Sequence, residues 1–311
     1  MHLVFYVLIG LILLLIVSGG YTFFFACKRL KEMPWLDKDV IEKTPYRQYY
    51  NAITTADQWL KDHNAKDISV TSEDGLRLHG LWVSAENPRG TILLAHGYRS
   101  TYLVDFSAVL DFYHQLGMNL LIPQQRCHGK SEGKYITFGV KESKDMASWL
   151  WYHNEKFGKI PVILSGLSMG ASTVLFMADE PLPSNVRGII ADCGFTSPKE
   201  IIGVVFKRVI HLPPAPTLWV ADLFARVFAG FSLCQKDSRK TLKKTHLPVL
   251  LVHGTGDDFV PCSMSKQAYE ACASPKQLFL AEGAGHGLSF FVEKEQYSTL
   301  IRDFLATNIE N

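Results

Sequence analysis

The sequence predicts an α/β protein with a mostly parallel eight-stranded sheet, helices on both faces of that sheet and a helical cap. Three observations lead to this class. Short apolar, β-branched segments alternate with helical segments along most of the 311 residues, the series opens with a hairpin, and residues 196–246 interrupt it without a strand pattern. With 47% hydrophobic residues the chain can bury one sizeable core.

The first element is an apolar segment without a charged residue from Leu3 to Cys27. As a helix it would be roughly 37 Å long, enough to cross a hydrocarbon core of about 30 Å. We therefore predict a membrane anchor over residues 1–31. The alternatives are a cleaved signal peptide of a secreted protein and a lipoprotein site at Ala26-Cys27. Basic residues follow the segment at Lys28, Arg29 and Lys31, so the positive-inside rule predicts that the chain after the segment lies on the cytoplasmic side.

Residues 32–66 are predicted to form a linker region with a helix from Tyr46 to Asp62, and residues 67–311 to form the α/β domain. Strands are expected at 68–71, 76–84, 91–95, 119–122, 162–165, 188–191, 249–253 and 277–281. Helices are expected at 103–116, 141–156, 169–179, 263–273 and 293–306. The insert at 196–246 leaves from the carboxyl end of a strand, where ligands bind in open α/β sheets, and we interpret it as a helical cap.

The pentapeptide Gly166-Leu-Ser168-Met-Gly170 is predicted to place a nucleophile. A Gly-x-Ser-x-Gly pattern forms a nucleophile elbow only between a strand and a helix, and both flanking segments have these patterns. Side chains at the two glycine positions would crowd the tight turn that exposes the serine hydroxyl. Ser168 is therefore the candidate nucleophile.

A serine nucleophile needs a base and an acid that orients the base. We expect the acid and then the histidine to follow the serine along the chain. The only histidine beyond Asp258 is His286, which is therefore the candidate base. The turn after the strand at 249–253 offers two carboxylates, Asp257 and Asp258. Asp192, at the end of another strand, is the alternative acid, although we expect it to anchor the start of the cap.

Five sequence blocks carry a specific resemblance to serine hydrolases of the α/β-hydrolase fold: LLAHGYRS (93–100), QQRCHGKSEG (124–133), GLSMG (166–170), VHGTGDDFVP (252–261) and GAGHG (283–287). The chain most resembles the bacterial, membrane-anchored, esterase-like branch that is related to prolyl-oligopeptidase-type catalytic domains. The resemblance covers residues 66–308. It implies Ser168 as nucleophile, Asp257 as acid and His286 as base.

The expected oxyanion hole uses the backbone N–H of Met169, which follows the nucleophile, and a second N–H from the loop after the strand at 91–95. By the resemblance, that second donor is Tyr98. His96 and His253, at strand ends, are expected to be structural. The chain departs from the family at Gln124-Gln125-Arg126, where Asp-x-Arg is common, so Arg126 is expected to be structural too.

Several classes are excluded or not supported. A formal net charge of +2 gives no basic excess for nucleic acid. We expect no metal and no cofactor, because the sequence lacks HExxH, P-loop and GxGxxG motifs. Five cysteines follow the first segment without a CxxC pair and are expected to be reduced. Oligomeric state is not predicted.

The predicted function is hydrolysis of a carboxylic ester through an acyl-enzyme, with an apolar acyl or aromatic group bound under the Leu-, Val- and Phe-rich cap. The predicted partners are thus a small-molecule ester and the membrane. A thioesterase or small-peptide hydrolase is the alternative enzyme. The alternative from another class is a non-catalytic, membrane-anchored binding protein.

Overall fold

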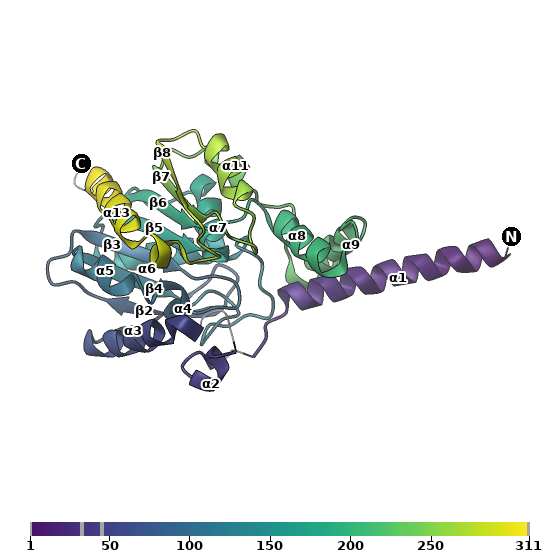
Figure 1. The fold of residues 1–311 in the computed structure, drawn as a ribbon, viewed down its shortest axis with the longest axis horizontal. Coiled ribbons are helices and arrows are strands. Elements are labelled where there is room, and N and C mark those ends of the chain that lie inside the picture. Colours follow the sequence, from purple (N-terminus) through teal and green to yellow (C-terminus); the bar gives the residue numbers. More distant parts are fainter. Residues whose placement is uncertain (1, 32–33, 44–46, 310–311) are drawn as a thin grey trace.

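The computed structural model describes residues 2–31, 34–43 and 47–309 (Figure 1). Its centre is one eight-stranded sheet in the order β1-β2-β4-β3-β5-β6-β7-β8. β1 and β2 form the antiparallel hairpin, β2 is antiparallel to β4, and the other strands are parallel. The strands are β1 (Lys66–Thr71), β2 (Arg77–Val83), β3 (Gly90–Ala95), β4 (Met118–Pro123), β5 (Val162–Leu167), β6 (Val186–Asp192), β7 (Val249–Gly254) and β8 (Lys276–Ala281). The predicted class is confirmed.

Helices cover both faces of the sheet because alternate strand residues point to opposite sides. In β3, Ile92 and Leu94 belong to one buried cluster, whereas Leu93 and Ala95 belong to the other. The first cluster includes side chains of α3 (Tyr50–Asp62), α4 (Tyr102–Phe106), α5 (Leu110–Gln115) and α13 (Lys294–Ile309). The second includes side chains of α6 (Glu142–Phe157), α7 (Met169–Phe176), α10 (Ser238–Leu242) and α11 (Ser263–Ala271).

The helix predicted over 103–116 is wrong as a single element, because it is broken between α4 and α5. The Ser107 hydroxyl donates to the Val104 carbonyl, and the Val109 N–H bonds to Phe106, three residues back. The new helix starts where the Tyr113 N–H bonds to the Val109 carbonyl. The predicted helix at 169–179 also ends early, at Phe176, and continues as a 3₁₀ turn at Met177–Asp179. Short helices at Lys38–Ile41 (α2), Arg47–Tyr49 (3₁₀) and Ser289–Val292 (α12) complete the described chain apart from the insert and α1.

The insert is helical. It contains α8 (Pro198–Ile210), α9 (Thr217–Phe224) and a π-helical turn at Ala225–Ala229, which lie beyond the carboxyl edge of the sheet (Figure 1). Ser197 begins α8 by accepting a hydrogen bond from the Glu200 N–H, and Pro198 occupies its first turn. The last helix of the insert, α10, packs with α7 and α11 against the sheet instead of joining the cap.

The N-terminal helix α1 (His2–Cys27) is long and apolar enough to cross a membrane by length and composition. Its first part extends away from the body, and its last turns lie beside α9 (Figure 1). Gly19 and Gly20 make this approach possible, since a Cβ atom at these positions would lie 2.5 Å from Val220 and 3.1 Å from Phe224. Phe23 is consequently only 2% exposed. The helix therefore packs against the cap at its base.

Candidate active site

Ser168 lies in a strained turn between β5 and α7, with φ 56° and ψ −115°. Its N–H donates to the Asp192 carbonyl at the end of β6. Both glycines of the pentapeptide are needed by the backbone. A Cβ at Gly166 would collide with the Gly170 carbonyl, and a Cβ at Gly170 would collide with the carbonyl of Ala95. The local sequence therefore permits a turn that presents the serine hydroxyl at the carboxyl edge of the sheet.

The structure brings Ser168, His286 and Asp257 into one hydrogen-bonded chain. His286 Nε2 is 2.8 Å from Ser168 Oγ, and His286 Nδ1 is 2.7 Å from Asp257 Oδ2. The other Asp257 oxygen, Oδ1, accepts the N–H groups of Phe259 and Val260 at 2.8 and 2.9 Å. Both carboxylate oxygens are thus engaged, which fixes the direction of Oδ2 toward the imidazole.

The protonation of this chain follows from its partners. Burial alone would raise the pKa of Asp257, but hydrogen bonds from His253 and His286 hold it below its ordinary value. Because an ionised carboxylate only accepts hydrogen bonds, Nδ1 of His286 carries the proton that faces it. Nε2 is then free to accept the proton of the Ser168 hydroxyl, as a general base requires.

The two strand-end histidines support neighbouring loops. His253 is fully buried, and its Nε2 lies 3.0 Å from the Val260 carbonyl and 3.2 Å from Asp257 Oδ2. His96 Nε2 accepts the N–H of Gln125, and burial lowers the pKa of His96 to about 4. The Gln125 side-chain amide also donates to the His96 carbonyl. His96 and Gln125 therefore hold the loop after β3 against the segment after β4.

Asp192 has its side-chain partners in the C-terminal helices. Its carboxylate accepts the Ser289 hydroxyl at 3.1 Å and also interacts with Tyr297, so it connects β6 to the C-terminal helices. Burial raises its pKa. The prediction that Asp192 anchors the start of the cap is wrong, because its partners come from the C-terminal helices α12 and α13.

The loop after β3 lies directly against the nucleophile, since a Cβ at Gly97 would be 3.4 Å from Ser168 Cβ. Its next residue, Tyr98, lines the same pocket as Ser168. Met169 is the first residue of α7, where helical N–H groups have no partner within the helix. These are the positions at which the sequence predicts the two oxyanion donors.

Asp105, in α4, was not identified from the sequence, although it fixes this loop. Its Oδ2 accepts the Gly97 N–H at 2.5 Å, and its Oδ1 accepts the Ser100 hydroxyl at 2.6 Å. Burial raises the pKa of Asp105 to about 6. The available signal was a single carboxylate in the apolar run LVDFSAVL, which local patterns cannot distinguish from an exposed helical residue.

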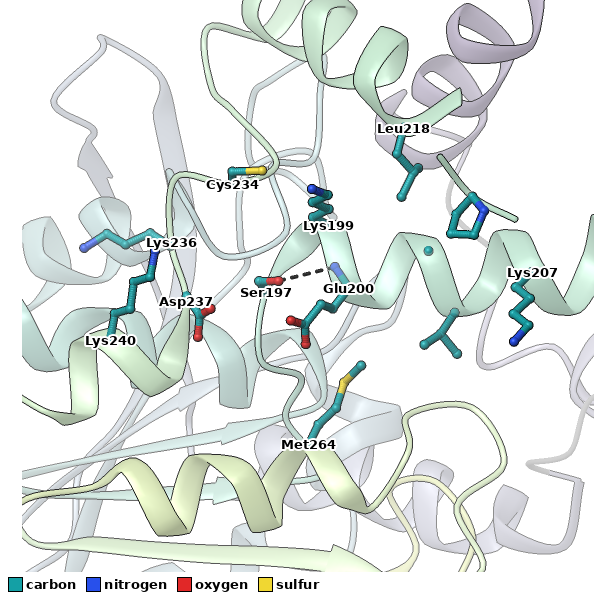
Figure 2. A pocket seen from close by; sticks show the side chains of 13 residues that line it. Ser197, Lys199, Glu200, Lys207, Leu218, Cys234, Lys236, Asp237, Lys240 and Met264 are labelled. Carbon is teal, nitrogen blue, oxygen red and sulfur yellow. Dashed lines mark hydrogen bonds between the residues drawn. The ribbon is translucent and has the colours of Figure 1, made fainter. Parts of the chain in front are cut away.

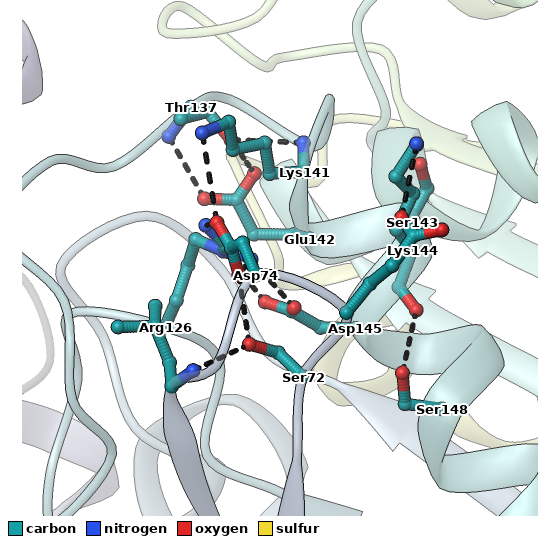
Figure 3. A network of polar contacts seen from close by, with 12 residues as sticks. Ser72, Asp74, Arg126, Thr137, Lys141, Glu142, Ser143, Lys144, Asp145 and Ser148 are labelled. Carbon is teal, nitrogen blue, oxygen red and sulfur yellow. Dashed lines mark hydrogen bonds and ion pairs between the residues drawn. The ribbon is translucent and has the colours of Figure 1, made fainter. Parts of the chain in front are cut away.

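Arg126 joins a largely buried polar network (Figure 3). Its guanidinium donates to both oxygens of Asp145 at 2.6 and 2.7 Å and to both oxygens of Asp74 at 3.0 Å. Nearby, Glu142 accepts the N–H groups of Thr137 and Gly139 at 2.8 and 2.9 Å. The network therefore connects the hairpin, α6 and the loop that carries Phe138.

A cavity of about 410 Å³ opens above Ser168 and is walled by two helices. From α1 come Ser18, Tyr21, Thr22, Phe25 and Ala26, and from α8 come Ile201, Ile202, Val205, Phe206, Val209 and Ile210. The other lining residues are Tyr98, Arg99, Phe138, Ser168, Phe195 and Phe259. This size is typical of small-molecule sites, and its lining is mainly apolar. We call it the acyl pocket below, for the group that we propose it holds.

A second, more open hollow of about 650 Å³ has a different character. Figure 2 shows Lys199, Lys236 and Lys240 around it, with Glu200 and Asp237 among them. Its lining does not include Ser168, His286 or Asp257. The hollow is therefore separate from the candidate site.

Among the described residues, Cys193, Asp257 and His286 place possible metal-ligating atoms within 4.8 Å of one another. Burial raises the pKa of the Cys193 thiol well above its ordinary value, whereas a metal ligand must be a thiolate. Both ring nitrogens of His286 already have hydrogen-bond partners. The group fits proton transfer better than metal binding.

Two family models match the chain over most of its length after α1. One describes "Serine aminopeptidase, S33" and matches residues 86–228, and the other describes "TAP-like protein" and matches residues 232–309. Among curated proteins, the chain is 29% identical to YqkD of Bacillus subtilis over 76% of this chain and 77% of that protein. It is 25% identical to Protein bem46 of Schizosaccharomyces pombe over 78% of this chain and 76% of that protein.

Solved structures with the same fold include esterases. The Pyrococcus furiosus esterase Pf2001 matches with a TM-score of 0.66 and 24% identity, over 80% of this chain and 94% of that one. Est1E from Butyrivibrio proteoclasticus, solved with ferulic acid, matches with a TM-score of 0.62 and 18% identity, over 78% of this chain and all of that one.

Proposed function

Since the chain is a serine hydrolase of the α/β-hydrolase fold, we propose that it cleaves carboxylic esters with an apolar acyl group, using Ser168, His286 and Asp257 as a catalytic triad. The observation that carries the proposal is the continuous chain of hydrogen bonds from Asp257 through His286 to Ser168, at the base of an apolar cavity.

In the proposed reaction, Ser168 Oγ attacks the ester carbonyl while His286 Nε2 takes its proton. The N–H groups of Tyr98 and Met169 stabilise the oxyanion, and His286 then protonates the leaving alcohol. Water, deprotonated by His286, attacks the acyl-enzyme and releases the carboxylic acid. Removing one oxyanion donor typically costs about 10²- to 10³-fold in turnover, so the loop held by Asp105 matters to the rate.

The serine aminopeptidase model favours a peptidase as the second candidate. A site for a free peptide amino terminus needs an anionic partner, but the described lining of the acyl pocket offers no carboxylate and one guanidinium, that of Arg99. The apolar lining suits an acyl chain, bound as an ester or thioester. The relation to prolyl-oligopeptidase-type domains stays a prediction.

We further propose that α1 is retained as a membrane anchor, with the catalytic domain on the cytoplasmic side as the basic residues after it predict. Phe23 and Cys27 are buried against the domain, at 2% and 1% exposure. A signal peptide that is cleaved off would not be expected to pack against the mature domain. A Cys27 that carries a lipid would be expected to be accessible and not buried. These contacts support the uncleaved anchor.

Labelling by a fluorophosphonate probe tests the proposal, because it needs an activated serine and no knowledge of the substrate. Wild type and a Ser148→Ala control, changed at a partly exposed serine of α6, should label equally. Ser168→Ala should neither be labelled nor hydrolyse p-nitrophenyl esters. A folded wild type that does not label, or a Ser168→Ala variant that labels like wild type, would favour the binding protein.

A further inference from the structure

The acyl pocket is unusual in one respect, because one of its walls belongs to the helix that resembles a membrane span. Tyr21, Thr22 and Phe25 of α1 line the same cavity as Ser168. They recur at helical spacing with Ser18 and so form one face of α1. The opposite wall is α8, and the nucleophile lies at the base. A ligand that fills this cavity therefore contacts α1 and the catalytic serine together.

The contacts at the base of α1 hold this wall in place. The Tyr98 hydroxyl donates to the Ala26 carbonyl at 2.7 Å, and the Arg99 guanidinium donates to the Phe25 carbonyl at 2.6 Å. A basic group at the C-terminal end of a helix is favourable for both its free carbonyls and its dipole. Beyond the helix, Lys28 forms a β-bridge with Tyr135. The last turns of α1 are thus fixed to the domain, at the loop predicted to hold an oxyanion donor.

The part of α1 that extends free of the domain is short for a membrane span. The turns before the packed Gly19, residues 2–17, would cover about 24 Å as a helix. Spanning a hydrocarbon core of about 30 Å takes about 20 residues. The bilayer must therefore extend down to the turns of α1 that pack against α9, which are also the turns that line the pocket.

The cap, whose helix α9 packs on α1, has exposed apolar side chains. Trp219 of α9 and Val227 of the π-helical turn are 65% and 68% exposed, and Val209 at the end of α8 is 65% exposed. Large apolar side chains exposed on a water-soluble surface would favour aggregation, whereas next to a membrane-spanning helix they extend the apolar surface of that helix. Leu212, Leu223 and Phe228 belong to the same exposed group.

From these observations we propose that the acyl pocket binds the acyl chain of a membrane lipid ester, which enters between α1 and α8 directly from the bilayer. The inference rests on the proposed function for its chemistry and names the class of substrate. Hydrolysis adds water across the ester bond, so the products are a fatty acid and the lipid alcohol. α1 is in this view a binding element as well as an anchor.

The test compares two tryptophan substitutions in full-length protein reconstituted in phosphatidylcholine vesicles. Thr22→Trp fills the pocket from the α1 side, and Val17→Trp adds the same bulk at a residue that is 67% exposed and does not line the pocket. We expect Thr22→Trp to lower kcat/KM for p-nitrophenyl dodecanoate by about tenfold or more relative to p-nitrophenyl butyrate. Val17→Trp should leave the ratio unchanged. If Thr22→Trp hydrolyses both esters through Ser168 with the wild-type ratio of the two kcat/KM values, the inference is overturned.

A second measurement does not depend on catalysis. The Ser168→Ala variant is irradiated in vesicles with a dodecanoic acid that carries a diazirine at its chain end, and the modified peptides are identified. Crosslinks to the buried pocket residues Phe138 and Ile201, lost in Thr22→Trp and kept in Val17→Trp, would support the inference even if no ester were hydrolysed. Crosslinks confined to residues 3–17 would overturn it.

Discussion

The catalytic end of the molecule and its acyl pocket are built in opposite ways. The catalytic end consists of three residues that follow strands β5, β7 and β8, namely Ser168, Asp257 and His286. Their polar atoms have defined hydrogen-bond partners. The pocket above them is formed by apolar side chains from α1 and α8, which are far apart in the sequence. In the proposed function, the first region sets the reaction by its geometry. The second region, in the same proposal, selects a ligand by the volume and the apolar surface of the pocket.

The comparison predicts that changes at the catalytic end lower turnover for short and long esters alike, and the largest effect is expected from Asp257→Asn. An amide cannot stabilise the imidazolium and favours the wrong tautomer of His286, so kcat should fall about 10⁴-fold. Asp258→Asn, an exposed neighbouring change, is the matched control and should keep wild-type kcat. Asp192→Asn should mainly lower stability. Wild-type turnover in Asp257→Asn would refute the assignment of the acid.

The next effect is on stability. Arg126→Met removes the cation between Asp145 and Asp74 and leaves the 1% exposed Asp145 carboxylate without its partner. A buried ion pair broken in this way costs about 3–5 kcal/mol. Lys130→Ala breaks the exposed pair with Asp67 and should cost at most about 1 kcal/mol. The measurement is chemical unfolding in detergent. Equal losses in the two variants would show that the network contributes no more than a surface pair.

A smaller effect depends on pH through Asp105. Its folded-state pKa of about 6 lies above its ordinary value of 3.8, so the folded state binds the proton more tightly than the unfolded state. The contribution of Asp105 to the free energy of unfolding is therefore fully present below pH 4. It is lost as the pH rises to 6, and the total change is a few kcal/mol at most. Asp105→Asn cannot titrate, so the difference between wild type and variant should change across this window. Parallel stability profiles from pH 4 to 7 would contradict this account.

The smallest effect concerns the contact between the two regions. Tyr98→Phe keeps the ring stacked on Phe138 but removes the hydrogen bond to the Ala26 carbonyl. One such bond contributes about 1 kcal/mol, which should appear as a lower Tm in detergent. Tyr6→Phe, at a 68% exposed position in the free part of α1, should leave the Tm unchanged. The same Tm for both variants would mean that the hydroxyl does not hold the helix.

The fold class could be predicted because each strand is a local apolar segment and the topology of parallel sheets restricts their order. The three residues brought together at the catalytic end could be proposed for a similar reason. A strand, a tight turn and a helix surround Ser168, and only one histidine, His286, follows Asp257 and Asp258. Their catalytic roles remain a proposal until the substitutions are made.

The pocket could not be predicted, because no local pattern connects residue 22 with residue 205. The apolar pattern of α1 indicates a membrane span, and that of α8 and α9 indicates a cap, but the two are joined by packing at Gly19 and Gly20. Asp105 was missed because its partners, Gly97 and Ser100, are loop residues whose backbone positions are set by tertiary structure. The break of the 103–116 helix has the same origin, since side-chain and turn hydrogen bonds there outweigh helix propensity.

The packing of α1 against α9 has a practical consequence for anyone who prepares a soluble, shortened form of this protein. Cutting the chain before Lys28 would uncover the side of the cap that holds Phe23, including Phe224 and Phe228. It would also remove five residues of the pocket wall and open the cavity to water. A catalytic end could survive such truncation with its hydrogen bonds intact. The chain-length preference measured on it would belong to the fragment and not to the full-length protein.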